Sequence, residues 1–128
     1  MIITSPLKRA VETGKIVAAK MNVPLYREVL LIEQNYGIYE GVDRKEPQFL
    51  NSKRNFAYRY PGGESMMQVA YRIYGFIDKI KEEYSEKKIL LISHGGVCRI
   101  IRTYFTDMTN EEFFHYTLEN AKCEEYEL

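Results

Sequence analysis

Cysteine, net charge and long apolar runs are scarce or missing in this 128-residue sequence. The two cysteines, Cys98 and Cys123, form no CxxC pair and no disulfide framework, so we expect a protein of the reducing cytoplasm. Eighteen basic residues balance eighteen acidic ones, and the basic ones are scattered, so we expect no binding to nucleic acid or to an anionic membrane. No apolar run approaches membrane-spanning length, and the first residues have no signal-peptide pattern.

The composition that is present suits a globular protein. Hydrophobic residues make up 45% of the chain and charged residues 28%. A chain of this length forms one domain and buries most of the surface that it exposes when unfolded. We therefore expect a single domain over residues 1–128.

The order of apolar runs and turns predicts strands that alternate with helices. Strands are predicted at residues 1–4, 23–32, 89–93 and 122–128. Helices are predicted from Pro6 to about Lys20, from Ser65 to about Tyr84, behind Gly96 and after Thr109. The segment from Tyr36 to Tyr60 is polar and aromatic, which indicates loop and short helix. The alternation is typical of an α/β sandwich with a largely parallel sheet.

Local signals place the helix ends and the buried faces. Ser5 and Pro6 are predicted to be the N-cap and first position of the first helix. Ser65 with Gln68, and Thr109 with Glu112, have the spacing of capping boxes. Helical spacing predicts inward-facing side chains. These are Val11, Ile16 and Val17 in the first helix, Val69, Ile73, Phe76, Ile77 and Ile80 in the second, and Val97, Ile100, Ile101 and Tyr104 in the third.

The strand Leu90-Leu91-Ile92 runs into Ser93-His94-Gly95-Gly96, and this is the most informative stretch of the chain. A strand of this kind delivers the imidazole of His94 to the carboxyl edge of the sheet, where open α/β proteins bind their ligands. The glycines allow close approach of the backbone, and the following helix offers free N–H groups to an anion. A titratable side chain beside an anion site suggests phosphate chemistry.

Two other segments carry candidate site residues. Arg9 lies in the first turn of a helix after a strand, where a guanidinium can grip phosphate oxygens. Glu33 follows an apolar run and is a candidate general acid. Taken singly, each residue has a simpler reading: Arg9 as a surface arginine, Glu33 as a solvated loop residue and His94 as a structural histidine.

Four segments occur in one fixed order: Ser-Pro-Leu-x-Arg-Ala, Leu-x-Glu-x-x-Tyr-Gly-x-x-Glu-Gly, Pro-Gly-Gly-Glu-Ser and Ser-His-Gly-Gly. Together they closely resemble the histidine phosphatase superfamily, also called phosphoglycerate mutase-like, over residues 2 to about 123. The resemblance implies a three-layer sandwich and cleavage of phosphomonoesters through a phosphohistidine, without metal or other cofactor. The short interval from Glu33 to Glu64 favours a compact phosphatase of small phosphorylated metabolites over a mutase, because mutases of this family carry a long insertion there.

The resemblance also implies roles for individual residues. Arg9 and the backbone N–H of Gly96 would bind phosphate, and Glu33 would protonate the leaving alcohol. His94 would stabilise the transferring phosphoryl group, and Tyr36 would line the substrate pocket. The tyrosine-rich stretch after Tyr36 would shape that pocket, and candidates to meet a second anionic group are Arg44, Arg54 and Arg59.

One family segment has no counterpart in this sequence. The family's nucleophile lies in an Arg-His-Gly-x-Thr motif that precedes Ser-Pro-Leu, and no Arg-His-Gly occurs here. The other histidine, His115, lacks a glycine turn and is expected to be structural. Cys98 has no Cys-x5-Arg spacing and is expected to be a small buried side chain.

We therefore expect a phosphoglycerate mutase-like α/β domain that is N-terminally incomplete and lacks its first strand and helix. Strands without ladder partners then invite pairing with another chain, so a homo-oligomer or strand exchange is expected. The expected function is that of a histidine-type phosphatase, inactive or impaired for want of the nucleophile. The first alternative is a non-catalytic pseudophosphatase that binds phosphorylated ligands, and the second is a truncated gene product without a function.

Overall fold

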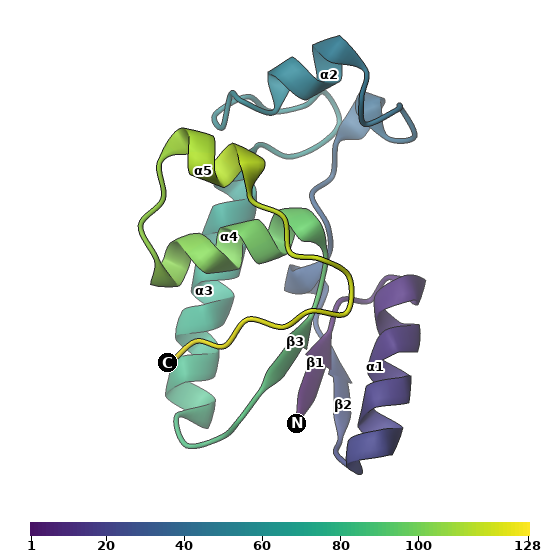
Figure 1. Ribbon diagram of the computed structural model, residues 1–128, viewed down its shortest axis with the longest axis vertical. Coiled ribbons are helices and arrows are strands. Elements are labelled where there is room, and N and C mark those ends of the chain that lie inside the picture. Colours follow the sequence, from purple (N-terminus) through teal and green to yellow (C-terminus); the bar gives the residue numbers. More distant parts are fainter.

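The computed structural model describes residues 1–128 and contains one parallel sheet (Figure 1). Its strands are β1 (Ile2–Thr4), β2 (Leu25–Arg27) and β3 (Leu90–Ile92), in the order β2-β1-β3. Ile3 of β1 lies opposite Tyr26 of β2 and Leu91 of β3. The predicted parallel sheet is confirmed, and the carboxyl ends of all three strands meet at one edge.

Helices cover both faces of the sheet (Figure 1). Helix α1 (Lys8–Met21) packs on one face, where a Cβ placed on Gly14 would lie 3.0 Å from Leu25 Cδ1, so the helix sits close to the strands. Helices α3 (Met66–Tyr84) and α4 (Gly95–Phe105) pack on the other face and against each other. This three-layer arrangement is the one that the sequence predicts.

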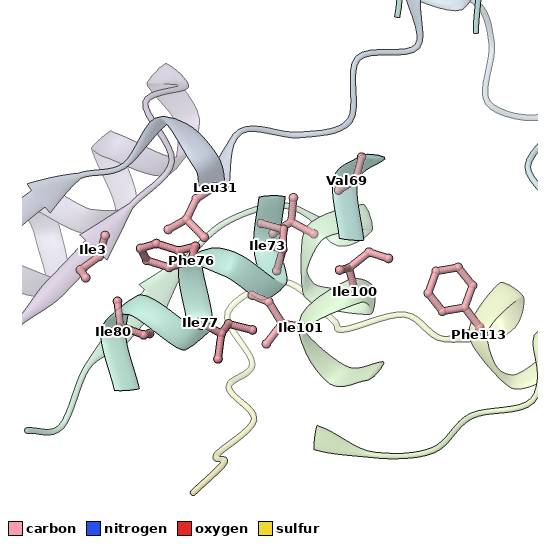
Figure 2. Close-up of a cluster of buried hydrophobic side chains, with 11 residues drawn as sticks. Ile3, Leu31, Val69, Ile73, Phe76, Ile77, Ile80, Ile100, Ile101 and Phe113 are labelled. Atoms are coloured by element: carbon pink, nitrogen blue, oxygen red, sulfur yellow. The ribbon is translucent and has the colours of Figure 1, made fainter. Parts of the chain in front are cut away.

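The hydrophobic core lies between the sheet and the α3–α4 pair (Figure 2). Leu31 comes into this core from the single-turn helix η1 (Val29–Leu31), and Phe113 comes from α5 (Asn110–His115). The predicted inward face of α3 is confirmed, since its buried side chains are Val69, Ile73, Phe76, Ile77 and Ile80. In α4 the buried side chains are Val97, Ile100 and Ile101.

Local capping signals fix two of the helix starts. The capping boxes of Ser65 with Gln68 and of Thr109 with Glu112 are both formed, as predicted. Between β2 and α3 the chain forms only η1, η2 (Gly37–Tyr39) and α2 (Pro47–Ser52), which confirms the irregular segment. None of the helices combines the length and the apolarity that a membrane crossing requires.

The predicted start of the first helix is wrong by two residues. The N-cap is Leu7, and α1 begins at Lys8. Ser5 belongs to the sheet instead: its N–H donates to the Ile92 carbonyl at 2.9 Å and continues the β1–β3 ladder, and its Oγ lies 2.7 Å from His94 Nε2. In the same helix Ile16, predicted to face inward, is 63% exposed.

The predicted final strand at 122–128 is also wrong, since this segment forms no strand. Side chains hold it instead: the Tyr126 ring stacks on Phe105 at 4.6 Å, and Glu124 accepts from Arg102 at 2.5 Å. A groove of about 710 Å³ separates it from β3, whose outer edge pairs with no strand of the chain. Pairing of that edge with another chain stays a prediction.

Candidate active site

A hollow of about 970 Å³ opens at the carboxyl ends of the strands. Four of the five predicted site residues line it: Arg9, Glu33, Tyr36 and Gly96. They come from three different connections, because Arg9 follows β1, Glu33 and Tyr36 follow β2, and Gly96 follows β3. Parallel strands bring such connections together at one edge, which is why distant segments share this hollow.

The carboxylate of Glu33 lies at the N-terminus of α4. Its Oε2 accepts from the Gly96 N–H at 3.3 Å, and its Oε1 accepts from the Gln34 N–H at 2.9 Å. The first N–H groups of a helix have no partner within the helix and carry partial positive charge, so they attract anions. Glu33 therefore occupies the position in which the sequence predicts a phosphate oxygen.

His94 lies beside the hollow rather than in its lining. It is the N-cap residue of α4, is only 7% exposed, and places its Nε2 2.7 Å from the Ser5 Oγ. Burial lowers the pKa of His94 and Arg9 lowers it further, while Glu33 acts in the opposite direction. The neutral imidazole is thus the favoured form at neutral pH.

The guanidinium of Arg9 is available to a ligand. Arg9 lies in the first turn of α1 on the exposed surface and lines the hollow. It forms no ion pair, whereas its neighbour Lys8 pairs with Glu12 at 3.8 Å. An unpaired guanidinium beside a helix N-terminus can bind two phosphate oxygens at once.

Aromatic rings form one wall of the hollow. Tyr36 packs edge-on against Phe49 at 5.1 Å and against Tyr60 at 5.4 Å, and Tyr39 stacks on Phe49. Burial, followed by the charge of Glu33, raises the pKa of Tyr36, so its phenol stays protonated at neutral pH. The wall can pack against an apolar part of a substrate and can donate one hydroxyl hydrogen bond.

A partly buried ion pair holds the loop that carries Glu33. The Arg72 guanidinium donates to Glu64 Oε1 at 3.0 Å, to the Ile32 carbonyl at 2.8 Å and to the Leu30 carbonyl. Glu64 Oε2 also accepts from the Asn35 N–H at 3.0 Å. The Pro-Gly-Gly-Glu-Ser segment thus positions Glu33 through these contacts, although sequence reasoning gave it no such role.

Two further cations, Lys53 and Arg99, line the hollow, and neither is predicted from the sequence. Arg99 lies three residues after Gly96 in α4, and residues at that spacing share a helix face, so this signal was present in the sequence. No local signal points to Lys53.

Of the three arginines that the sequence predicts to meet a second anionic group, only one lines the hollow. Arg44 lines the hollow, but Arg54 pairs with Glu111 at 2.5 Å and Arg59 donates to the Gly63 carbonyl at 3.2 Å, and neither lines it.

The remaining candidate nucleophiles and metal ligands lie elsewhere. His115 is exposed, pairs with Glu111 at 3.3 Å and does not line the hollow. Burial raises the pKa of the Cys98 thiol to about 11, so the reactive thiolate is disfavoured. No three histidine, cysteine or carboxylate side chains lie close enough together to hold a metal ion.

Two known proteins of similar sequence are named as phosphatases. The chain is 31% identical over 103 residues to the uncharacterized phosphatase PhoE of Bacillus subtilis, covering 80% of this chain and 51% of PhoE. It is 29% identical over 126 residues to an acid phosphatase of Mycobacterium tuberculosis, covering 94% of this chain and 59% of that protein. The chain thus spans between half and three fifths of the length of these two relatives.

The fold agrees with that similarity. A putative alpha-ribazole-5'-P phosphatase from Escherichia coli superposes with a TM-score of 0.72 at 21% identity, over 93% of this chain and 62% of that one. The family model of the histidine phosphatase superfamily (branch 1) matches residues 1–128. The chain therefore belongs to the histidine phosphatase superfamily, as its four motifs predict.

Proposed function

We propose that the hollow binds the phosphate of a small phosphomonoester and contributes to its hydrolysis as part of a histidine-type phosphatase site. Arg9 and the Gly96 N–H hold the phosphate oxygens, and His94 stabilises the transferring phosphoryl group. The bond between phosphorus and the alcohol oxygen breaks, and its electron pair stays on that oxygen. Glu33, displaced from the Gly96 N–H by the phosphate and in its protonated form, donates the proton that the alcohol requires. A nucleophile, in this family a histidine, accepts the phosphoryl group before water does.

One observation carries this proposal: the Glu33 carboxylate already lies at the N-terminus of α4, where it accepts from the Gly96 N–H, and it also accepts from the N–H of its own neighbour Gln34. An oxyanion is therefore stable at this helix N-terminus, and Arg9 lines the same hollow. The phosphoryl acceptor is not assigned to either histidine of the chain, so we propose that turnover by this chain is impaired.

Turnover of an aryl phosphate tests the proposal. We expect slow hydrolysis that Glu33→Gln lowers by about 100-fold or more, because the leaving group then lacks its proton donor. His94→Ala should abolish the hydrolysis. Glu82→Gln, at an exposed position of α3, should leave it unchanged. Inorganic phosphate binding, measured by titration calorimetry, accompanies the assay. Absence of both binding and hydrolysis overturns the proposal.

The alternative is a pseudophosphatase that binds phosphorylated ligands without cleaving them. The observation in its favour is the bond between His94 Nε2 and Ser5 Oγ, which already uses one of the two ring nitrogens of His94. Saturable phosphate binding without any hydrolysis supports this alternative over the enzyme.

The two glycines after His94 offer a matched pair for testing the binding mode. A Cβ on Gly96 would lie 2.6 Å from Glu33 Oε1, whereas a Cβ on Gly95 would meet nothing within 4 Å. We expect Gly96→Ala to weaken inorganic phosphate binding by about tenfold, because the methyl group fills the space beside the donating N–H. Gly95→Ala should bind phosphate as the unchanged protein does. Equal affinities in the two variants contradict binding at this helix N-terminus.

A further inference from the structure

We propose that Arg44, Lys53 and Arg99 form a second anion subsite in the hollow, so that the preferred ligand is a phosphomonoester with a second anionic group. This inference rests on the proposed function, because it takes the N-terminus of α4 with Arg9 as the phosphate end. The second anion is a carboxylate or another phosphate.

The three cations come from separate parts of the fold and line the same hollow. Arg44 lies in the loop before α2, Lys53 at the C-terminal end of α2, and Arg99 in α4. Burial lowers the pKa of Lys53, the charges of Arg44 and Arg99 lower it further, and Glu33 acts in the opposite direction. Like charges that line one hollow repel one another, and a bound anion relieves that repulsion.

None of the three cations has a carboxylate partner within the chain. The acidic residues of the hollow have other contacts. Glu33 accepts from the Gly96 N–H, Glu40 accepts from the Tyr36 N–H at 2.7 Å, and Glu64 pairs with Arg72. The hollow therefore carries an excess of positive charge, and cations without a carboxylate partner are suited to binding an anionic ligand.

The packing of Arg99 and Lys53 holds their charged groups in place. Arg99 donates one hydrogen bond to the Tyr116 carbonyl at 3.0 Å, but its Nε is shielded from solvent and has no partner. An unpaired buried donor costs free energy that a bound anion would recover. The Lys53 Nζ lies 4.5 Å from the centre of the Phe49 ring, so the aromatic wall fixes the ammonium group.

Matched ligand pairs test the second subsite. We compare phosphoglycolate with ethyl phosphate, and para-carboxyphenyl phosphate with phenyl phosphate, by titration calorimetry. In at least one pair we expect the carboxylate to improve affinity by about tenfold. Lys53→Met should reduce that gain by about fivefold while changing the affinity for inorganic phosphate by less than about twofold, and Lys53→Arg should restore the gain.

Arg54→Met is the control, because it removes a neighbouring positive charge that pairs with Glu111 outside the hollow. It should leave the carboxylate gain unchanged. The second subsite is overturned if inorganic phosphate binds but the carboxylate improves affinity in neither ligand pair. It is also overturned if Lys53→Met and Arg54→Met change that gain in affinity equally. Either result leaves the proposed phosphate site at the N-terminus of α4 intact. If inorganic phosphate does not bind at all, the proposed function fails first.

Discussion

Gly63→Ala is expected to lower the free energy of unfolding by about 3 kcal/mol. A Cβ at this buried position would lie 2.3 Å from the Asn35 carbonyl oxygen and 2.7 Å from the Gly37 nitrogen. Both are backbone atoms, so no side chain can move aside and the loop itself must shift. That shift breaks the hydrogen bond from the Glu64 N–H to the Asn35 carbonyl, now 2.8 Å long.

The same shift displaces the neighbouring Glu33, so we expect phosphate binding to weaken with stability. The measurement is urea unfolding followed by circular dichroism, together with a phosphate titration. Gly75→Ala is the control, because a Cβ there meets nothing within 4 Å in the exposed face of α3. It should raise stability by about 0.5–1 kcal/mol, since alanine favours a helix over glycine. The backbone clash would be contradicted if Gly63→Ala lowered the free energy of unfolding by less than Gly75→Ala raises it.

Arg72→Met is expected to cost about 2–4 kcal/mol of unfolding free energy, because the Arg72–Glu64 pair is largely shielded from solvent. The side chain of Arg72 is 13% exposed and that of Glu64 is 26% exposed. Removal of the guanidinium leaves Glu64 Oε1 and the carbonyls of Leu30 and Ile32 without this donor, and Glu64 keeps only the Asn35 N–H. Urea unfolding gives the change in free energy.

Two further variants separate geometry from charge. Arg72→Lys keeps the charge but should recover less than half of the loss, because an ammonium lacks the planar fork that reaches three acceptors. Lys79→Met breaks the exposed Lys79–Glu83 pair of the same helix and should cost less than about 0.5 kcal/mol. Two results would contradict this role of Arg72: full recovery of the unfolding free energy in Arg72→Lys, or equal losses of unfolding free energy in Arg72→Met and Lys79→Met.

Helix α3 was the most predictable element of the fold. Its start follows from the Ser65–Gln68 capping box, and its buried face follows from apolar residues at helical spacing. Both signals act between residues a few positions apart, so no knowledge of the tertiary structure is needed to read them. The same holds for α5, which begins after the Thr109–Glu112 box.

The errors concern contacts between distant segments. The helix start at Ser5 was wrong because this residue bonds to Ile92 and His94 across the sheet. The strand predicted at 122–128 was wrong because a strand needs a neighbour to pair with, and the residues of this segment do not specify one. There the side chains of Glu124 and Tyr126 bind α4 instead.

The sequence alone determined the family, the parallel α/β sandwich, and the meeting of Arg9, Glu33, Tyr36 and Gly96 at one sheet edge. It determined these because motif order, helical periodicity and the common direction of parallel strands are all readable along the chain. The tertiary structure alone decided that His94 is buried against Ser5, that Glu33 lies on the N-terminus of α4, and that Lys53 joins Arg99 in the hollow. Such facts depend on side-chain packing between segments tens of residues apart, for which a single sequence contains no local signal.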